Sequence, residues 1–199
     1  FLKESVFASA TDNKYLKFDD YTYQDYYDNN KNKKGYIVRP NPNYQLSGKI
    51  TFPTEYNGLP VVSIGNFSSS QITHVFWLGD ENLLEVGGSA FNGNTTLQYF
   101  QLPYSVIAIR ASAFQSCSNL QYFDLFGYDN LEILEQFAFS GAWRSDKSEE
   151  LTIPPSVKRI GAMVFSYQNE MGAGGRVAPF YQVNIGYPDS SSQLQEIGG

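Results

Sequence analysis

The stretch "VGGSAFNGNTTLQYFQLP" (residues 86–103) is followed by a near copy, "IRASAFQSCSNLQYFDL" (residues 109–125), and this repetition decides the fold. Each copy opens on an apolar residue, reaches Phe five positions later and ends on alternating apolar residues. The same pattern returns at Phe139 and Phe165, and in a shortened form at Phe67, so the steps from Phe to Phe are 24, 23, 25 and 26 residues. Repetition at such a period is the sequence signature of a solenoid.

The second half of each copy reads as a short strand. Phe100 and Leu102 are two residues apart and share one face of a strand, whereas Tyr99 and Gln101 share the other. A single turn cannot bury its apolar face, but stacked turns align equivalent side chains into ladders of Phe, Leu and Ile. We therefore predict a mainly β solenoid of short parallel strands, with about five turns of 23–26 residues.

The repeated phrase also resembles a known family. Its form, L-x-x-I-x-x-x-A-F-x-x-C-x-x-L-x-x-F-x-L-P, is similar to the BspA-like, or Treponema pallidum-type, leucine-rich repeats, and the lead-in "SGKITFPTEYNGLPVVSIG" (47–65) fits the start of such arrays. The resemblance covers residues 47–199, with insertions at 144–150 and 168–178. It implies a leucine-rich-repeat solenoid of the kind that bacterial and protist cells display or secrete to bind host proteins or other cells.

The sequence predicts two parts. Residues 1–46 form a β-rich N-terminal cap, in which Leu16–Tyr27 and Tyr36–Arg39 are the arms of a β-hairpin that covers the open end of the solenoid. The acidic stretch "DDYTYQDYYDNN" (19–30) lacks the spacing of a calcium loop, although contact of its tyrosines with a sugar or a protein stays open. Residues 47–199 form the array, which ends on "LQEIGG" without a cap and is therefore incomplete at its C-terminus.

Composition argues against several classes of protein. The net charge is −6, with no basic cluster beyond "KNKKG" (31–35), which argues against nucleic-acid binding. No apolar run reaches the length of a membrane-spanning helix, and the N-terminus lacks the apolar core of a signal peptide, although an exported protein in mature form would lack one too.

The chemistry-bearing residues also argue against an enzyme. Cys117 is the only cysteine and His74 the only histidine of the 199 residues, too few for a disulfide, a nucleophile–base pair or a metal set. We interpret Cys117 as a buried structural residue, and the glycine-rich "MGAGGR" (171–176) as a flexible insertion instead of a phosphate loop. We predict no enzymatic activity, no cofactor and no metal.

Function in a solenoid is expected on the outward positions of its strands. Alignment of the copies places Trp77, Gln101, Asp124, Thr152 and Asn184 in one row, and Val75, Tyr99, Tyr122, Glu150 and Gln182 in the next. Both rows are predicted to lie on the concave sheet, with a candidate ligand site formed by Trp77, Tyr99, Gln101, Tyr122 and Asp124. Aromatic rings beside polar groups are typical of interface hot spots. The alternative is that these rings serve cross-strand packing alone.

These observations favour a non-enzymatic protein-binding or adhesion module of a cell-surface or secreted protein, most consistent with a bacterial source. Its partner would be an extracellular or host protein, or a glycan. The alternative is a structural or assembly segment of a larger surface protein or virion, which would self-associate through the open C-terminal end.

Overall fold

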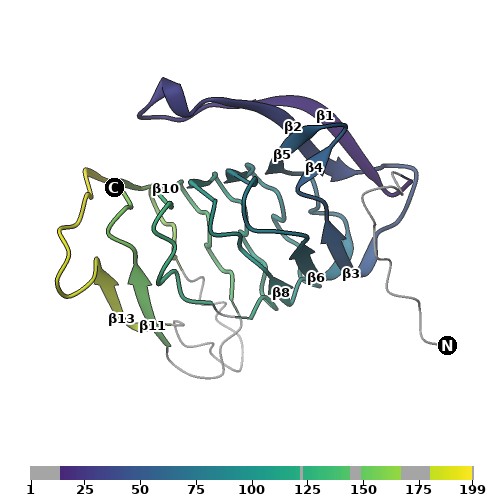
Figure 1. Ribbon diagram of the computed structural model, residues 1–199. Coiled ribbons are helices and arrows are strands. Elements are labelled where there is room, and N and C mark those ends of the chain that lie inside the picture. The colour runs from purple at the N-terminus through teal and green to yellow at the C-terminus, as the bar shows by residue number, and fades with distance from the viewer. Residues whose placement is uncertain (1–13, 122, 144–148, 167–179, 199) are drawn as a thin grey trace, which may run out of the picture.

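The computed structural model describes residues 14–121, 123–143, 149–166 and 180–198, and these are built almost entirely of β-strands (Figure 1). The only helix in the described ranges is the short 3-10 turn η1 (Asn29–Lys31). The strands are β1 (Leu16–Tyr23), β2 (Lys33–Pro40), β3 (Ser47–Phe52), β4 (Glu55–Tyr56), β5 (Leu59–Ile64), β6 (Gln71–Trp77), β7 (Glu85–Val86), β8 (Tyr99–Phe100), β9 (Ala108–Ile109), β10 (Ile133–Leu134), β11 (Glu149–Ile153), β12 (Arg159–Ile160), β13 (Phe180–Ile185) and β14 (Glu196–Ile197).

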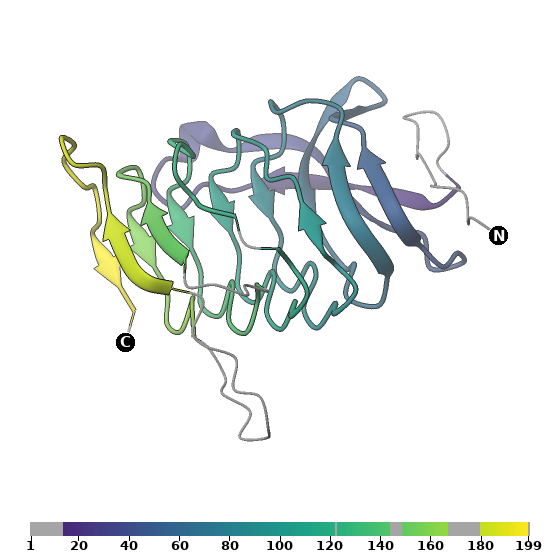
Figure 2. The ribbon, with the colours of Figure 1, turned by 90° about the horizontal axis from the view of Figure 1, so that it is seen from below.

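Successive turns of the chain stack side by side, so that equivalent strands pair in parallel (Figure 2). The main sheet has the order β1-β2-β5-β7-β9-β10-β12-β14, and β4 pairs antiparallel with β5. Two smaller parallel sheets, β3-β6-β8 and β11-β13, form the other long side of the coil (Figure 1). This arrangement confirms the predicted solenoid of about five turns.

A column of phenylalanine rings forms the centre of the stack. Phe91 and Phe114 are stacked with their ring centroids 5.7 Å apart and their planes 4° apart. The column continues to Phe67 on one side and through Phe139 to Phe165 on the other, with centroid distances between 5.3 and 6.0 Å. Each buried ring contributes roughly 1.5–3 kcal/mol through removal of apolar surface from water. Phe67 joins the column even though its spacing in the sequence is shortened.

The corner between the main sheet and this column repeats one backbone conformation. Ser89, Ser112, Phe137 and Met163 each stand three residues after a strand of the main sheet, with φ between 53° and 59°. Backbone hydrogen bonds join the corners of adjacent turns, as from Phe91 N to the Ala113 carbonyl at 2.8 Å. The turns are therefore linked by backbone pairing at the corners as well as in the sheets.

The N-terminal hairpin caps the first turn, as the sequence predicts. Strands β1 and β2 pair antiparallel, and β2 pairs in parallel with β5, which covers the N-terminal edge of the main sheet. The first arm is shorter than predicted and ends at Tyr23, because the Asp25 carboxylate accepts hydrogen bonds from the backbone N–H groups of Tyr27 and Asp28 and bends the chain.

The hairpin also extends beyond a cap. It arches along the outer face of the main sheet, and we call residues 16–40 the strap (Figure 1). At its tip, the Lys31 ammonium group forms an ion pair with Glu132, whose other carboxylate oxygen is 2.9 Å from Lys158 Nζ. The Arg159 guanidinium lies 5.2 Å from the centre of the Tyr26 ring. The strap thus covers the outer face of the main sheet and leaves the opposite side of the array open.

The last turn exposes side chains that stack as core residues earlier in the array. Val183 pairs with the buried Leu151, yet it is 48% exposed, and Ile185 is 46% exposed. Ile197 of β14 is 64% exposed, whereas its partner Ile160 is buried. Within the described residues, nothing stacks on this end of the ladder.

Candidate functional site

The outer side of the smaller sheets carries part of the predicted ligand site. Tyr99 of β8 is exposed, and Gln101 beyond it is half-buried, with its Oε1 accepting from Trp77 N at 3.2 Å. The half-buried Asp124 uses Oδ1 to accept the backbone N–H groups of Leu125 and Thr152, both at 2.8 Å. Tyr122 lies outside the described residues.

Trp77 is not on this surface, so its predicted outward position is wrong. Its side chain is only 6% exposed, and its ring lies 5.1 Å from Phe52 in the core. The reason is register. Phe67 and Phe91 are 24 residues apart, whereas the paired Val75 and Phe100 are 25 apart. A slip of one residue moves each side chain of a strand to the opposite face.

The same shift turns Val75 inward and places other rings on the surface. Val75 is fully buried, and His74 of β6 instead pairs with Tyr99. The ring of Phe76, the next outward residue, is 5.4 Å from the Tyr99 ring. Phe76 therefore takes the outward position that sequence alignment assigned to Trp77.

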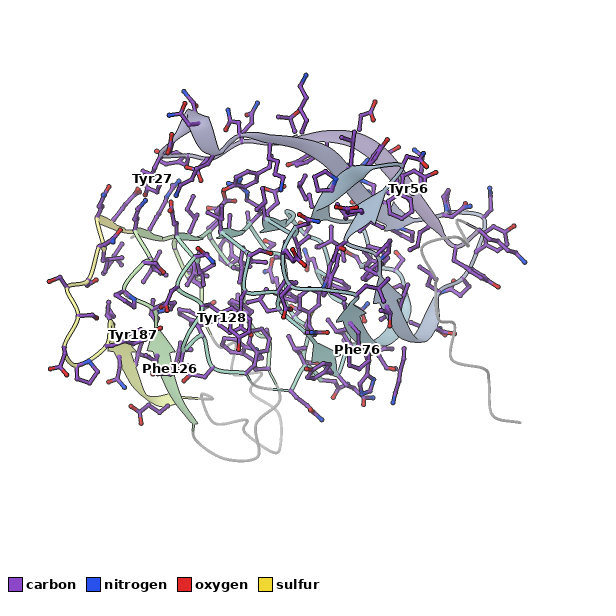
Figure 3. The ribbon with its side chains drawn as sticks, viewed as in Figure 1. Tyr27, Tyr56, Phe76, Phe126, Tyr128 and Tyr187 are labelled. Atoms are coloured by element: carbon purple, nitrogen blue, oxygen red, sulfur yellow. The ribbon has the colours of Figure 1, made fainter. Side chains whose placement is uncertain are left out.

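Aromatic residues of the following loops extend this surface. Tyr104, 54% exposed, stacks on Tyr128 with centroids 4.8 Å apart. Phe126, 61% exposed, lies 4.9 Å from the Tyr187 ring. Phe76, Phe126, Tyr128 and Tyr187 all lie on the side of the array away from the strap (Figure 3). We call this surface the aromatic face, formed by Phe76, Tyr99, Tyr104, Phe126, Tyr128 and Tyr187.

Sequence reasoning missed the loop members of the aromatic face. Tyr104 and Phe126 directly follow the repeated "QLP" and "FDL" segments, at positions where the ladder requires no apolar side chain. An aromatic residue at such a position in two successive copies was the available signal.

Carboxylates surround the aromatic face. Asp80 and Glu81, in the loop after β6, are exposed, and the Asp80 carbonyl accepts from Ser105 N beside Tyr104. Burial, reinforced by Tyr104, Tyr99 and Asp80 in turn, raises the pKa of Tyr128 to about 12. Asp129 accepts a 2.7 Å hydrogen bond from the Tyr187 hydroxyl. These groups give the face a negative potential at neutral pH.

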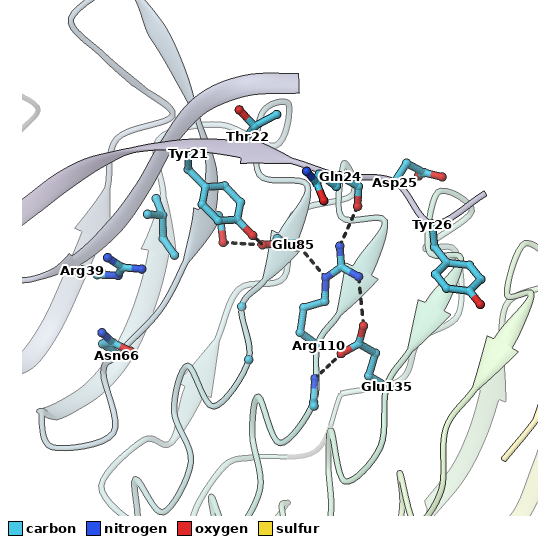
Figure 4. Close-up of a pocket in the computed structure, with 15 residues that line it drawn as sticks. Tyr21, Thr22, Gln24, Asp25, Tyr26, Arg39, Asn66, Glu85, Arg110 and Glu135 are labelled. Atoms are coloured by element: carbon cyan, nitrogen blue, oxygen red, sulfur yellow. Dashed lines mark hydrogen bonds and ion pairs between the residues drawn. The ribbon is translucent and has the colours of Figure 1, made fainter. Parts of the chain in front are cut away.

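A second hollow, of about 900 Å³, lies between the strap and the main sheet (Figure 4). Arg110 spans it, with Nε 2.7 Å from Glu85 and Nη1 3.1 Å from Glu135, while Nη2 donates to the Gln24 carbonyl of the strap. Glu85 also accepts from the hydroxyls of Tyr21 and Ser63. Because these carboxylates are paired with Arg110 and other donors, their arrangement anchors the strap instead of offering a free acid and base.

The two residues that invite catalytic readings have structural surroundings. Cys117 is fully buried, and its thiol donates to the Phe91 carbonyl at 3.1 Å; burial raises its pKa to about 12. His74 Nδ1 lies 2.9 Å from Thr73 Oγ1, and burial followed by Lys49 lowers the His74 pKa, so the ring is neutral at pH 7. The described residues contain no cluster of His, Cys, Asp and Glu suited to a metal ion. The "MGAGGR" stretch lies outside the described residues.

Comparison with protein-family models matches residues 46–171 to six copies of the BspA type leucine rich repeat region. The chain belongs to the BspA-type leucine-rich repeat family. Among solved structures, this BspA-type chain is similar to the T. pallidum leucine-rich repeat protein, with a TM-score of 0.60 and 22% identity, covering 93% of this chain and 79% of that one.

A leucine-rich repeat protein from Bacteroides ovatus is also similar to the BspA-type chain, with a TM-score of 0.52 and 19% identity, covering 92% of this chain and 45% of that one. At these identities the likeness supports the fold alone. Comparison with curated protein sequences finds no significant match.

Membership of the BspA-type family bears on function in general terms. Leucine-rich repeat families are generally non-enzymatic modules of protein interaction, and BspA-type repeats are typically associated with bacterial surfaces. Within the described ranges, no helix has the length and apolar character needed to cross a bilayer.

Proposed function

We propose that the chain is a non-enzymatic protein-binding or adhesion module of a bacterial cell-surface or secreted protein, and that it binds its partner through the aromatic face. The observation that supports this proposal is the gathering of exposed rings from successive turns on the one long side that the strap leaves open. The face replaces the Trp77-centred site predicted from sequence and keeps Tyr99 of that prediction.

The physical argument rests on what these rings do not do. Tyr104 and Phe126 expose more than half of their surface, whereas the stacked phenylalanines already fill the core. Tyrosine and other large rings dominate binding energy at protein interfaces because they bury much area and have few rotatable bonds. A solenoid whose turns are joined by continuous backbone pairing holds such rings in fixed positions, which lowers the entropic cost of binding.

The test is a direct binding measurement with the purified chain. Wild-type protein is screened by surface plasmon resonance against extracellular-matrix and host-cell surface proteins, and each positive is measured again with Tyr99→Ala and Tyr104→Ala. We expect each substitution to weaken binding about tenfold or more. Tyr44→Ala is the matched control, because Tyr44 is as exposed as Tyr99 but lies before β3, outside the aromatic face.

Two results would count against the proposal. Unchanged affinity in both variants would move the site away from the aromatic face. Binding to glycan arrays alone, lost in the same variants, would keep the face and replace the protein partner by a carbohydrate.

A second candidate function, assembly through the C-terminal end, is favoured by one observation. Val183, Ile185 and Ile197 are exposed at the last turn, where strands β13 and β14 each pair on one side only within the described residues. Unpaired strand edges with apolar neighbours are templates for further pairing. Light scattering across a concentration series tests this function: Ile185→Lys should abolish any self-association, and a wild-type chain that stays monomeric throughout excludes it.

A further inference from the structure

Charges are distributed unevenly along the chain. Between residues 50 and 157, Arg110 is the only Lys or Arg that the structure describes, and it lies under the strap between Glu85 and Glu135. The aromatic face belongs to this stretch and its C-terminal continuation, and its loops carry Asp80, Glu81 and Asp129. On this side of the array the nearest described cation is Lys49 of β3, which lies beside His74.

The opposite side of the molecule shows what such a set of groups binds. Under the strap, Lys158 Nζ lies 5.1 Å from the centre of the Tyr27 ring and 2.9 Å from Glu132. Arg110 is 5.7 Å from the centre of the Tyr23 ring and hydrogen-bonded to Glu85. In both places one cation is held by a ring face together with a carboxylate. The aromatic face has the rings and the carboxylates but not the cations.

We propose that the aromatic face recognises a cationic, arginine-rich segment of the partner protein. A guanidinium group can lie flat on an exposed Tyr or Phe ring while its N–H groups donate to a neighbouring carboxylate. Tyr104 with Asp80 offers this combination, since Asp80 accepts the backbone N–H next to Tyr104 and influences the adjoining Tyr128 ring. The inference rests on the proposed function, because it specifies the partner of the same face.

The probe is a short fluorescein-labelled peptide that alternates Arg with Gly and Ser, compared with a peptide in which citrulline replaces each Arg. Binding to the purified chain is measured by fluorescence anisotropy at low and at physiological ionic strength. We expect the citrulline peptide to bind at least tenfold more weakly, and Tyr104→Ala and Asp80→Asn each to weaken the arginine peptide about fivefold. Tyr44→Ala and Glu55→Gln are the matched controls, because both residues are exposed and lie outside the aromatic face.

The outcomes separate this inference from the proposed function. Equal weakening by Asp80→Asn and Glu55→Gln, with Tyr104→Ala silent, would mean that the peptide responds only to net charge, and the inference would be wrong. An arginine peptide that does not bind, beside a protein partner whose binding still depends on Tyr99, would overturn the cationic preference and keep the proposed function. Loss of every Tyr99-dependent or Tyr104-dependent interaction from the data would overturn both.

Discussion

Asn94 and Cys117 occupy the same corner position in successive turns, and each donates to the carbonyl of the ladder phenylalanine one turn before it. Asn94 Nδ2 lies 3.0 Å from the Phe67 carbonyl, and Cys117 Sγ lies 3.1 Å from the Phe91 carbonyl. Both side chains are buried. A polar rung thus accompanies the phenylalanine column, and either residue type can supply it.

Asn94 carries more of this arrangement than Cys117. Its Oδ1 accepts the backbone N–H groups of Thr96 and Leu97, each at 3.1 Å, while its amide donates to the preceding turn. Asn94→Ala leaves several buried backbone groups unpaired, and we expect the free energy of unfolding to fall by about 3 kcal/mol in chemical denaturation. Asn94→Cys retains a donor to Phe67 and should lose less. Equal stability of both variants and wild type would show that the corner does not need the rung.

The Cys117 thiol should resist modification in the folded protein. Its pKa is raised to about 12 by burial, and only the thiolate is reactive, so at pH 8 both ionisation and access oppose attack. We expect a thiol-specific chromogenic disulfide to label the native chain at least a hundredfold more slowly than the urea-unfolded chain. Rapid stoichiometric labelling of folded protein would contradict the buried structural role.

The strap should loosen in acid before the array does. Burial of Asp25 by itself would raise its pKa, but the N–H groups of Tyr27 and Asp28 and the Tyr23 hydroxyl outweigh burial and lower it below 3.8. A carboxyl with a lowered folded-state pKa contributes stability above its unfolded pKa, and this stability is lost as the pH falls through the folded value.

Hydrogen exchange checks this prediction at the bend. Between pH 5 and about pH 3, amides at residues 27–31 should lose protection relative to those of the ladder corners, after correction for intrinsic rates. Asp25→Asn, which removes the titrating group, should abolish the pH dependence. A pH-dependent loss of protection that persists in this variant would assign it to another carboxylate.

Much of the fold was predictable from the sequence because the repeat places equivalent residues at equivalent positions. Phe91, Phe114 and Phe139 share their spacing with the preceding apolar residue, and they stack as expected. The strap was only partly predictable. Its β1–β2 pairing follows from alternation, but the contact of Lys31 with Glu132 joins residues about a hundred positions apart, and no local pattern encodes it.

The candidate site was less predictable than the fold because strand register depends on single residues. One extra residue between Phe67 and Val75, relative to the interval from Phe91 to Phe100, turned the outward row at β6 by one position. The ladder tolerates this change since the corner absorbs it, but the surface does not. Tyr99 was placed correctly because its own copy contains no such irregularity.

A neighbouring pair of substitutions tests the corrected register. Phe76 and Trp77 are adjacent in β6 but lie on opposite faces, with Phe76 beside Tyr99 and Trp77 beside Phe52. Trp77→Ala should lower the free energy of unfolding by about 3–5 kcal/mol through the cavity it leaves. Phe76→Ala should cost about 1 kcal/mol or less, because it removes a ring from the surface.

Trp77→Phe sharpens the comparison. The indole N–H of Trp77 is buried without a hydrogen-bond partner among the described residues, so a phenyl ring keeps most of the packing and removes an unsatisfied donor. We expect its stability to stay within about 1 kcal/mol of wild type in urea titrations, well above that of Trp77→Ala. If instead Phe76→Ala is the destabilising change and Trp77→Ala is tolerated, then Trp77 faces solvent and the sequence-derived row was right.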